Sequence, residues 1–315
     1  MNQITFDKGK KYSLHASTLE RSPERSLSEK EFFDLKNAKS CLNAALALEE
    51  NYDLLLQNYR ELELEAISAA VTDMTSMVHD YEDFFEIRTA MNRRVCNLLS
   101  ATRMYLDQYP KNLKKIGANL EPVKDVCSEF HDNFFEYRFM EALRNHVQHA
   151  GLAVHGVTMG GRWLPPRDPR KLEFSIIPYA LKKELEGTDF KKRVLQETPD
   201  KVLLIHAARV HVGGISSVHK KVRESIKPFV DEARALFEAA IAWHGAEKEE
   251  RYPSLSATAK EQGVVIERFS VFLDWDDIRQ KLLNRNDSVE NLANRFVTSQ
   301  VNGVIDHHNL HPLKA

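Results

Sequence analysis

One short segment of the chain combines residue types that could act on a phosphodiester. Arg144, Asn145 and His149 stand at the end of an aromatic-rich helical pattern that stops at Gly151. Arginine binds phosphate oxygens with a planar charged fork, an amide donates and accepts hydrogen bonds, and histidine exchanges protons near neutral pH. These groups could hold a phosphodiester and move protons around it without a metal ion. The segment is therefore the first candidate for catalysis.

The helical period places part of this segment on one face. At about 100° per residue, Asn145 and His149 lie one turn apart on nearly the same face, with Glu141 a turn before them. Arg144 and His149 would point about 140° apart on an ideal helix. The long arginine side chain, a loosened last turn or a second copy of the chain could still bring both groups to one groove. The structural alternative is that these residues only cap the helix and face its dipole.

The spacing resembles the signature of the HEPN superfamily, which is an arginine, a polar residue and then a histidine after four to six intervening residues. Arg144, Asn145 and His149 fit this signature, and the resemblance is specific over residues 130–156. It implies a helical bundle. For many members it also implies metal-independent endoribonuclease activity in toxin–antitoxin, abortive-infection (antiviral) and CRISPR-linked defence systems. Such members usually work as homodimers in which both motifs face a shared cleft, and some members have lost activity.

If the chain cleaves RNA, the roles of these side chains follow from their chemistry. We expect His149 to act as the general base on the 2′-hydroxyl or as the acid that protonates the leaving 5′-oxygen. Arg144 would bind two phosphate oxygens and stabilise the charge of the transition state, and Asn145 would orient His149 or donate to a phosphate oxygen. The expected products are a 2′,3′-cyclic phosphate and a 5′-hydroxyl, with no cofactor and no metal.

Other residues are expected to support the site or to contact RNA. Glu141, His146 and Gln148 are the supporting candidates, although a solvent-facing position is the simpler interpretation of His146. A basic segment with an indole follows the motif, and such a segment could guide single-stranded RNA. Its residues are Arg162, Trp163, Arg167, Arg170 and Lys171.

Composition bounds the class of protein. The 315 residues carry a net charge of −2, which argues against nucleic-acid binding through bulk charge, although a local basic patch remains compatible with it. The 12 glycines and 11 prolines are few, which favours helix. Cys41, Cys96 and Cys127 are far apart and are interpreted as reduced packing residues. Neither a signal-peptide pattern nor a membrane-spanning apolar run is evident, so we expect a cytoplasmic protein without membrane contact.

Apolar periodicity predicts the elements. Ser28 and Glu31 form a capping-box pattern that starts the first helical segment. A β-hairpin with a proline-rich loop is expected over 155–178 and a strand over 263–272. Asp274 and the acids after it are typical of a helix N-terminus. The predicted helical segments are 28–78 (one helix or two end to end), 84–109 stopped by Pro110, 121–150, a segment after 200 that Pro228 should kink or divide, and short helices near 275–284 and 287–300.

The predicted fold is mainly α, a HEPN-like helical bundle with a small β-hairpin appendage. We expect an N-terminal arm or hairpin over 1–25 and the bundle over 26–250, with a β-insert near 154–178. The residues 251–315 are expected to form a C-terminal extension, a strand plus short helices, packed on the bundle.

Two other classes of function compete with the nuclease. His206, His211 and His219 are separated by five and eight positions, which does not match the spacing of helical zinc ligands, so a metal-dependent hydrolase is disfavoured. A non-catalytic helical module that binds a protein or a nucleotide is the alternative to the nuclease. The expected partners are an RNA substrate, a second copy of the chain, and an antitoxin or other regulatory protein.

Overall fold

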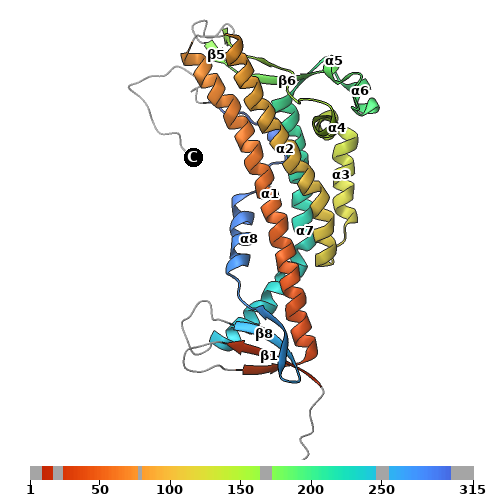
Figure 1. Cartoon of the computed structure of the whole chain (residues 1–315), viewed down its shortest axis with the longest axis vertical. Coiled ribbons are helices and arrows are strands. Elements are labelled where there is room, and N and C mark those ends of the chain that lie inside the picture. The colour runs from red at the N-terminus through yellow and green to blue at the C-terminus, as the bar shows by residue number, and fades with distance from the viewer. Residues whose placement is uncertain (1–8, 17–23, 77–79, 164–171, 246–254, 299–315) are drawn as a thin grey trace, which may run out of the picture.

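The computed structural model describes residues 9–16, 24–76, 80–163, 172–245 and 255–298. The fold is mainly α, as predicted: long helices run side by side along an elongated molecule, and small antiparallel sheets lie at its two ends (Figure 1). No helix in the described part of the chain is long and apolar enough to cross a membrane. The helices are α1 (Glu29–Thr75), α2 (Tyr81–Ile116), α3 (Glu121–Asn133), α4 (Phe135–His149), α5 (Lys182–Leu185), α6 (Lys192–Glu197), α7 (Leu204–Gly245), α8 (Asp274–Arg285) and the 3₁₀ turn η1 (Leu292–Asn294).

α1 is one continuous helix, which resolves the choice between one helix and two. The predicted capping box is confirmed: the Ser28 backbone N–H donates to Glu31 Oε2 over 2.7 Å, and the Glu31 N–H donates to Ser28 Oγ over 3.2 Å. Its apolar stripe, which includes Leu42 and Tyr52, is buried against α2 and α7. The three longest helices therefore form the centre of the bundle.

The prediction that Pro110 stops the second helix was wrong. α2 continues through Pro110 to Ile116 and ends at Gly117, whose φ of 87° allows the left-handed cap. Tyr109 and Leu113 on either side of the proline are buried in the core. A proline in a helix costs about 3 kcal/mol, and burial of these side chains offsets that cost.

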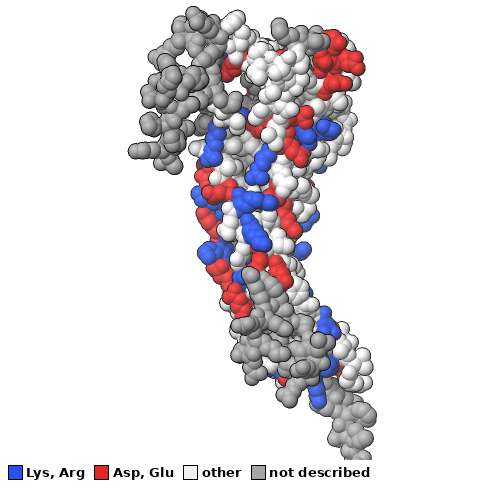
Figure 2. Space-filling model, turned by 90° about the vertical axis from the view of Figure 1, so that its left-hand side faces the viewer, with Lys and Arg blue, Asp and Glu red and all other residues white. Residues whose placement is uncertain are grey.

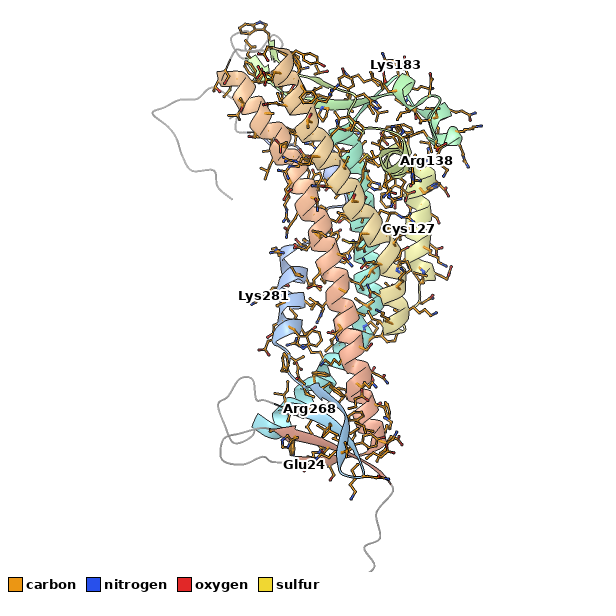
Figure 3. All side chains as sticks on the ribbon, viewed as in Figure 1. Glu24, Cys127, Arg138, Lys183, Arg268 and Lys281 are labelled. Atoms are coloured by element: carbon orange, nitrogen blue, oxygen red, sulfur yellow. The ribbon has the colours of Figure 1, made fainter. Side chains whose placement is uncertain are left out.

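The predicted single helix over 121–150 is two helices. The chain is extended at Phe134 (φ −117°, ψ 114°), which ends α3 and starts α4. Arg138, labelled in Figure 3, donates to the carbonyl oxygens of His131 and Asp132 over 2.6 and 2.9 Å. Carbonyl groups at a helix end lack hydrogen-bond donors within the helix, and this guanidinium donates the missing hydrogen bonds. Apolar periodicity runs across the break because both helices pack against α7.

α7 is continuous and includes Pro228, so the proline does not divide it. Figure 1 shows the helix turning toward the lower sheet near its C-terminal end. Gly213 and Gly214 lie in this helix where other segments approach closely. A Cβ on Gly214 would lie 2.8 Å from the Phe130 ring of α3, and one on Gly213 would lie 3.0 Å from the Glu290 carbonyl oxygen.

The lower sheet joins a segment near the start of the described chain to a hairpin after α7. Its strand order is β2 (Glu24–Leu27), β1 (Lys10–Ala16), β8 (Leu255–Glu261) and β9 (Val264–Ser270), all antiparallel. β9 confirms the strand predicted over 263–272, whereas β8 and the pairing of β1 with β8 were not predicted. Leu14 is buried in this sheet, and the hydroxyls of Ser13 and Thr258 are 2.9 Å apart across the β1–β8 pair. A segment near the start of the chain thus holds a segment near its end.

The predicted hairpin over 155–178 is confirmed and is more elaborate than expected. β3 (Gly156–Thr158) pairs with β6 (Ile177–Leu181), and β4 (Gly161–Trp163) pairs with β5 (Leu172–Phe174). β7 (Lys201–Leu203) adds a third strand beside β6. The proline loop itself lies outside the described residues.

The C-terminal region packs along α1 and α7. α8 begins at Asp274, as its acidic first turn predicted. The helix predicted over 287–300 was wrong: in its described part the helical structure is the single turn η1. The backbone N–H of Val289 donates to Ser216 Oγ of α7 over 2.8 Å, so tertiary contacts hold this segment in place of helical hydrogen bonds.

Candidate functional site

α4 carries the Arg–Asn–His segment and is held by its apolar face. Phe139, Ala142 and Leu143 are buried, and the helix contacts α2, α3 and α7. The backbone N–H groups of Ala150 and Gly151 donate to the His146 carbonyl, which ends the helix where the sequence predicted. A Cβ on Gly151 would lie 3.0 Å from His146 Nε2, so this glycine lets the chain turn closely around that ring.

Arg144 and Asn145 are brought together. Arg144 Nη1 donates to Asn145 Oδ1 over 3.1 Å, and both residues line a cavity of about 100 Å³ between α2, α4 and α7. Arg144 is half-buried, and its Nε is buried without a hydrogen-bond partner. The guanidinium is therefore oriented by its neighbour and keeps unused hydrogen-bonding capacity.

His149 does not share that cavity. It lies in the last turn of α4, and its side chain is exposed to solvent. It is absent from the cavity wall that contains Arg144 and Asn145. Within one copy of the chain, the imidazole and the guanidinium thus open toward different parts of the surface around the end of α4.

Of the supporting candidates, Glu141 lies at the cavity and Gln148 does not. Glu141 lines the cavity with Arg144 and is half-buried, while Gln148 is exposed at the helix end. Burial raises the pKa of the Glu141 carboxyl, and the nearby charges of His131, Arg103 and Lys191 oppose that shift. Glu141 is consequently a carboxyl whose protonated form is favoured relative to an exposed glutamate.

The solvent-facing interpretation of His146 was wrong. His146 is only 2% exposed, because it continues the buried face of Phe139 and Leu143 by one helical turn. Its Nδ1 lies 3.3 Å from Thr188 Oγ1, and its ring meets the His155 ring edge-on at 6.3 Å. Burial lowers the pKa of His146, so this ring is a neutral packing residue.

The described residues of the basic segment after the motif, Arg162 and Trp163, do not line the cavity. Arg162 and Trp163 are exposed on β4, and Arg162 pairs with Glu173 of β5 over 2.7 Å. Figure 1 places β5 beside the tips of α1 and α2, on the opposite side from α4. The other three residues of the segment, Arg167, Arg170 and Lys171, lie outside the described residues.

No role at the motif was predicted for the cations that do line the cavity. Arg103 of α2, Arg138 of α4 and Lys191, just before α6, belong to its wall. Arg138 also pairs with Glu197 of α6. Lys191 begins a visible basic run with Lys192, but nothing in the sequence places that run near α4. Figure 2 shows basic and acidic side chains interleaved over another face of the molecule, with no continuous patch of one sign there.

The scattered histidines have individual environments. In the described ranges, no group of three or more His, Cys, Asp and Glu side chains could hold a metal ion. His219 is buried, with Nε2 3.4 Å from Glu49 and Nδ1 2.9 Å from the Tyr105 hydroxyl, and Arg223 donates twice to Glu49. Burial raises the pKa of Glu49, but the hydrogen bonds from His219 and Arg223 outweigh it and lower that pKa to about 2. This network is a buried structural tie between α1, α2 and α7.

Comparison with known proteins adds no relative: no protein-family model, curated protein or solved structure matches the chain.

Proposed function

We propose that the chain is a metal-independent endoribonuclease of the HEPN type. The observation that carries the proposal is the hydrogen-bonded Arg144–Asn145 pair beside a cavity, with exposed His149 one turn further along α4. The guanidinium has a buried, unpartnered nitrogen, and no ion pair joins it to the described residues. A phosphodiester oxygen is a natural acceptor for such a group.

The proposed reaction is transesterification. His149 accepts the proton of the 2′-hydroxyl, whose oxygen attacks phosphorus, while the bond to the 5′-oxygen breaks and that oxygen takes up a proton. Arg144 binds the non-bridging phosphate oxygens, and Asn145 orients Arg144 through the hydrogen bond observed between them. The products are a 2′,3′-cyclic phosphate and a 5′-hydroxyl. DNA lacks the nucleophile and is not cleaved.

A homodimer would complete this site. Because His149 and Arg144 open to different parts of the surface in one copy, two copies meeting at the ends of α4 would line one groove with two guanidinium groups and two imidazoles. One imidazole could then act as the base and the other as the acid. We place the activity in a prokaryotic toxin-type or antiviral role, in which an antitoxin or regulatory protein restrains it.

The first prediction tests the role of His149. The purified chain should cleave single-stranded RNA in excess EDTA, and His149→Ala should lower the rate by at least about 100-fold, since loss of a general acid or base costs about 10²–10⁴ in rate. Gel analysis of a labelled oligonucleotide gives the rate and the chemistry of the new ends. His206→Ala is the matched control, because His206 is also an exposed histidine on a helix. Equal rates for the two variants, with unchanged circular dichroism, would reject His149 as the catalytic histidine, and absence of cleavage by the unmodified chain would reject the nuclease.

One observation favours a second candidate, the non-catalytic helical module that binds a protein or a nucleotide. His149 does not line the cavity that Arg144 and Asn145 share. A module of this kind would bind a ligand at the cavity without cleaving RNA. If the chain does not cleave RNA but binds a ligand at the cavity, that result would favour the non-catalytic module.

A further inference from the structure

Two buried nitrogen atoms without a partner belong to residues in the wall of the same cavity. Arg144 Nε and His211 Nδ1 make no hydrogen bond in the described part of the chain, and His211 is only 1% exposed. Both residues line the cavity of about 100 Å³ between α2, α4 and α7. An unpaired buried polar atom costs about 1–3 kcal/mol, so native proteins usually supply a partner from the protein, water or a ligand.

The charges around the cavity indicate what kind of ligand it fits. Arg103 and Lys191 are exposed residues of its wall, and Arg138 and Arg144 complete the set of cations there. Lys191 and Arg144 form no ion pair with the described residues, whereas Arg103 and Arg138 pair with carboxylates outside the wall. Glu141 is the one acidic residue among the described residues that line it. The wall therefore has an excess of positive charge and hydrogen-bond donors, which fits an anion.

We propose that this cavity binds a phosphate group. Arg144, Lys191 and Asn145 offer donors to its oxygens, and the carboxylate of Glu141 accepts a hydrogen bond from a protonated phosphate oxygen. This arrangement distinguishes phosphate from sulfate, because sulfate carries no proton at neutral pH and would place an unprotonated oxygen against Glu141. The inference goes beyond the proposed function, because a phosphodiester carries no proton at neutral pH and is therefore not the ligand proposed for this cavity. RNA would contact Arg144 outside it, and phosphate binding does not require that the chain cleave RNA.

The size of the cavity limits the ligand further. Sites for drug-sized molecules have volumes of roughly 300–1,000 Å³, and this cavity has about 100 Å³. It has room for one phosphate group and not for an attached nucleoside. The ligand is therefore either free phosphate or a terminal phosphate whose organic part stays outside the cavity.

Calorimetric titration of the full chain with inorganic phosphate and with sulfate tests the proposal. We expect phosphate to bind at least about tenfold more tightly than sulfate, and Glu141→Gln to bring the two affinities within about threefold, because the substitution removes the repulsion of sulfate. Lys191→Met should weaken phosphate binding about tenfold. Lys192→Met, at the neighbouring exposed lysine outside the wall, should change it by less than about twofold.

Three results would overturn the proposal. Absence of any heat with phosphate would mean that only water occupies the cavity. Equal affinity for phosphate and sulfate in the unmodified chain would remove the role of Glu141. Equal losses of phosphate affinity in Lys191→Met and Lys192→Met would mean that general surface charge, and not the cavity, binds phosphate.

Two further titrations separate this inference from the proposed function and identify the source of the phosphate. His149→Ala should bind phosphate like the unmodified chain even where RNA cleavage is lost, because His149 is not in the cavity wall. Tighter binding of adenosine 5′-monophosphate than of inorganic phosphate would assign the cavity to phosphate esters, and the reverse order would assign it to the free ion.

Discussion

At the residue scale, the two histidines of the motif segment show how three positions along a helix change the chemistry of a side chain. His146 continues the apolar face of α4 and is buried beside Thr188, whereas His149 is exposed in the last turn. Both are histidines near a helix end, and the sequence pattern alone ranked only His149 as catalytic. The structure makes His149 the imidazole of the two that is accessible to solvent, whereas the sequence interpretation had His146 facing solvent as well.

A second prediction concerns His211, whose burial sets its protonation. Burial lowers the pKa of His211 to about 3 from its ordinary value of 6.5. Between those values the unfolded chain binds a proton that the folded chain does not. The free energy of unfolding therefore falls as the pH drops below about 6.5, by up to about 1.4 kcal/mol per pH unit from this group. His219 and His146 shift in the same direction and add to the fall.

The measurement is urea unfolding at several pH values between about 7 and 4. His211→Gln should reduce the slope of unfolding free energy against pH by roughly 1 kcal/mol per unit, because glutamine does not titrate in this range. His206→Gln, at an exposed position, should leave the slope unchanged. Identical slopes for His211→Gln and the unmodified chain would show that His211 is protonated in the folded state.

At the element scale, packing decided where helices end and how closely they approach. Pro110 does not end α2, because buried Tyr109 and Leu113 hold the helix on both sides of it. Phe134, which has no breaking signal, does separate α3 from α4, and Arg138 satisfies the carbonyls left at that break. The local sequence predicted the opposite at both positions: a helix end at Pro110 and a continuous helix through Phe134.

A third prediction tests the close approach of α3 and α4 to α7 at Gly214. Alanine in place of glycine inside a helix usually stabilises by about 1 kcal/mol. Here the added Cβ would lie 2.8 Å from the Phe130 ring and 3.1 Å from the Tyr137 ring. Overpacking of this kind costs about 1–3 kcal/mol, so Gly214→Ala should destabilise the protein.

Chemical denaturation of Gly214→Ala gives the sign directly. Glu232→Ala, on the exposed face of the same helix, controls for the general effect of alanine and should change the unfolding free energy by less than about 0.5 kcal/mol. If Gly214→Ala is more stable than the unmodified chain, α3 and α4 can move away from α7 at this point without lowering the unfolding free energy.

At the scale of the whole molecule, segments near the two ends of the described chain share one sheet. β1 pairs along its whole length with β8, and Leu14 of β1 is 1% exposed. This pairing closes the lower end of the bundle, where α1 begins and the C-terminal part of α7 approaches (Figure 1). The N-terminal strand should therefore stabilise the C-terminal hairpin directly.

A fourth prediction follows from that pairing. Leu14→Ala should lower the unfolding free energy by about 2–4 kcal/mol, as large-to-small changes in cores do. It should also speed amide hydrogen exchange in β8 and β9 more than in α3 and α4, because the loss is local to the lower sheet. Lys10→Ala, on an exposed residue of the same strand, should have neither effect. Equal acceleration of exchange in all elements would show that the sheet is not a separate unit of stability.

Local sequence alone determined the class of fold and most of the long elements of this protein. Apolar spacing of three and four residues requires helices with one buried face, and Ser28 with Glu31 specifies a helix start whatever lies around it. The same spacing placed Arg144, Asn145 and His149 at a helix end. Those are local properties, because they depend on residues a few positions apart.

Tertiary structure alone decided what surrounds that helix end. Lys191, Arg103 and His211 reach the Arg144 cavity from segments distant in sequence, and β1 meets β8 across most of the chain. Such contacts depend on which faces pack together. Burial of apolar surface is non-directional and leaves many pairings open to a single sequence. The cavity and its charge were therefore visible only once the helices were assembled.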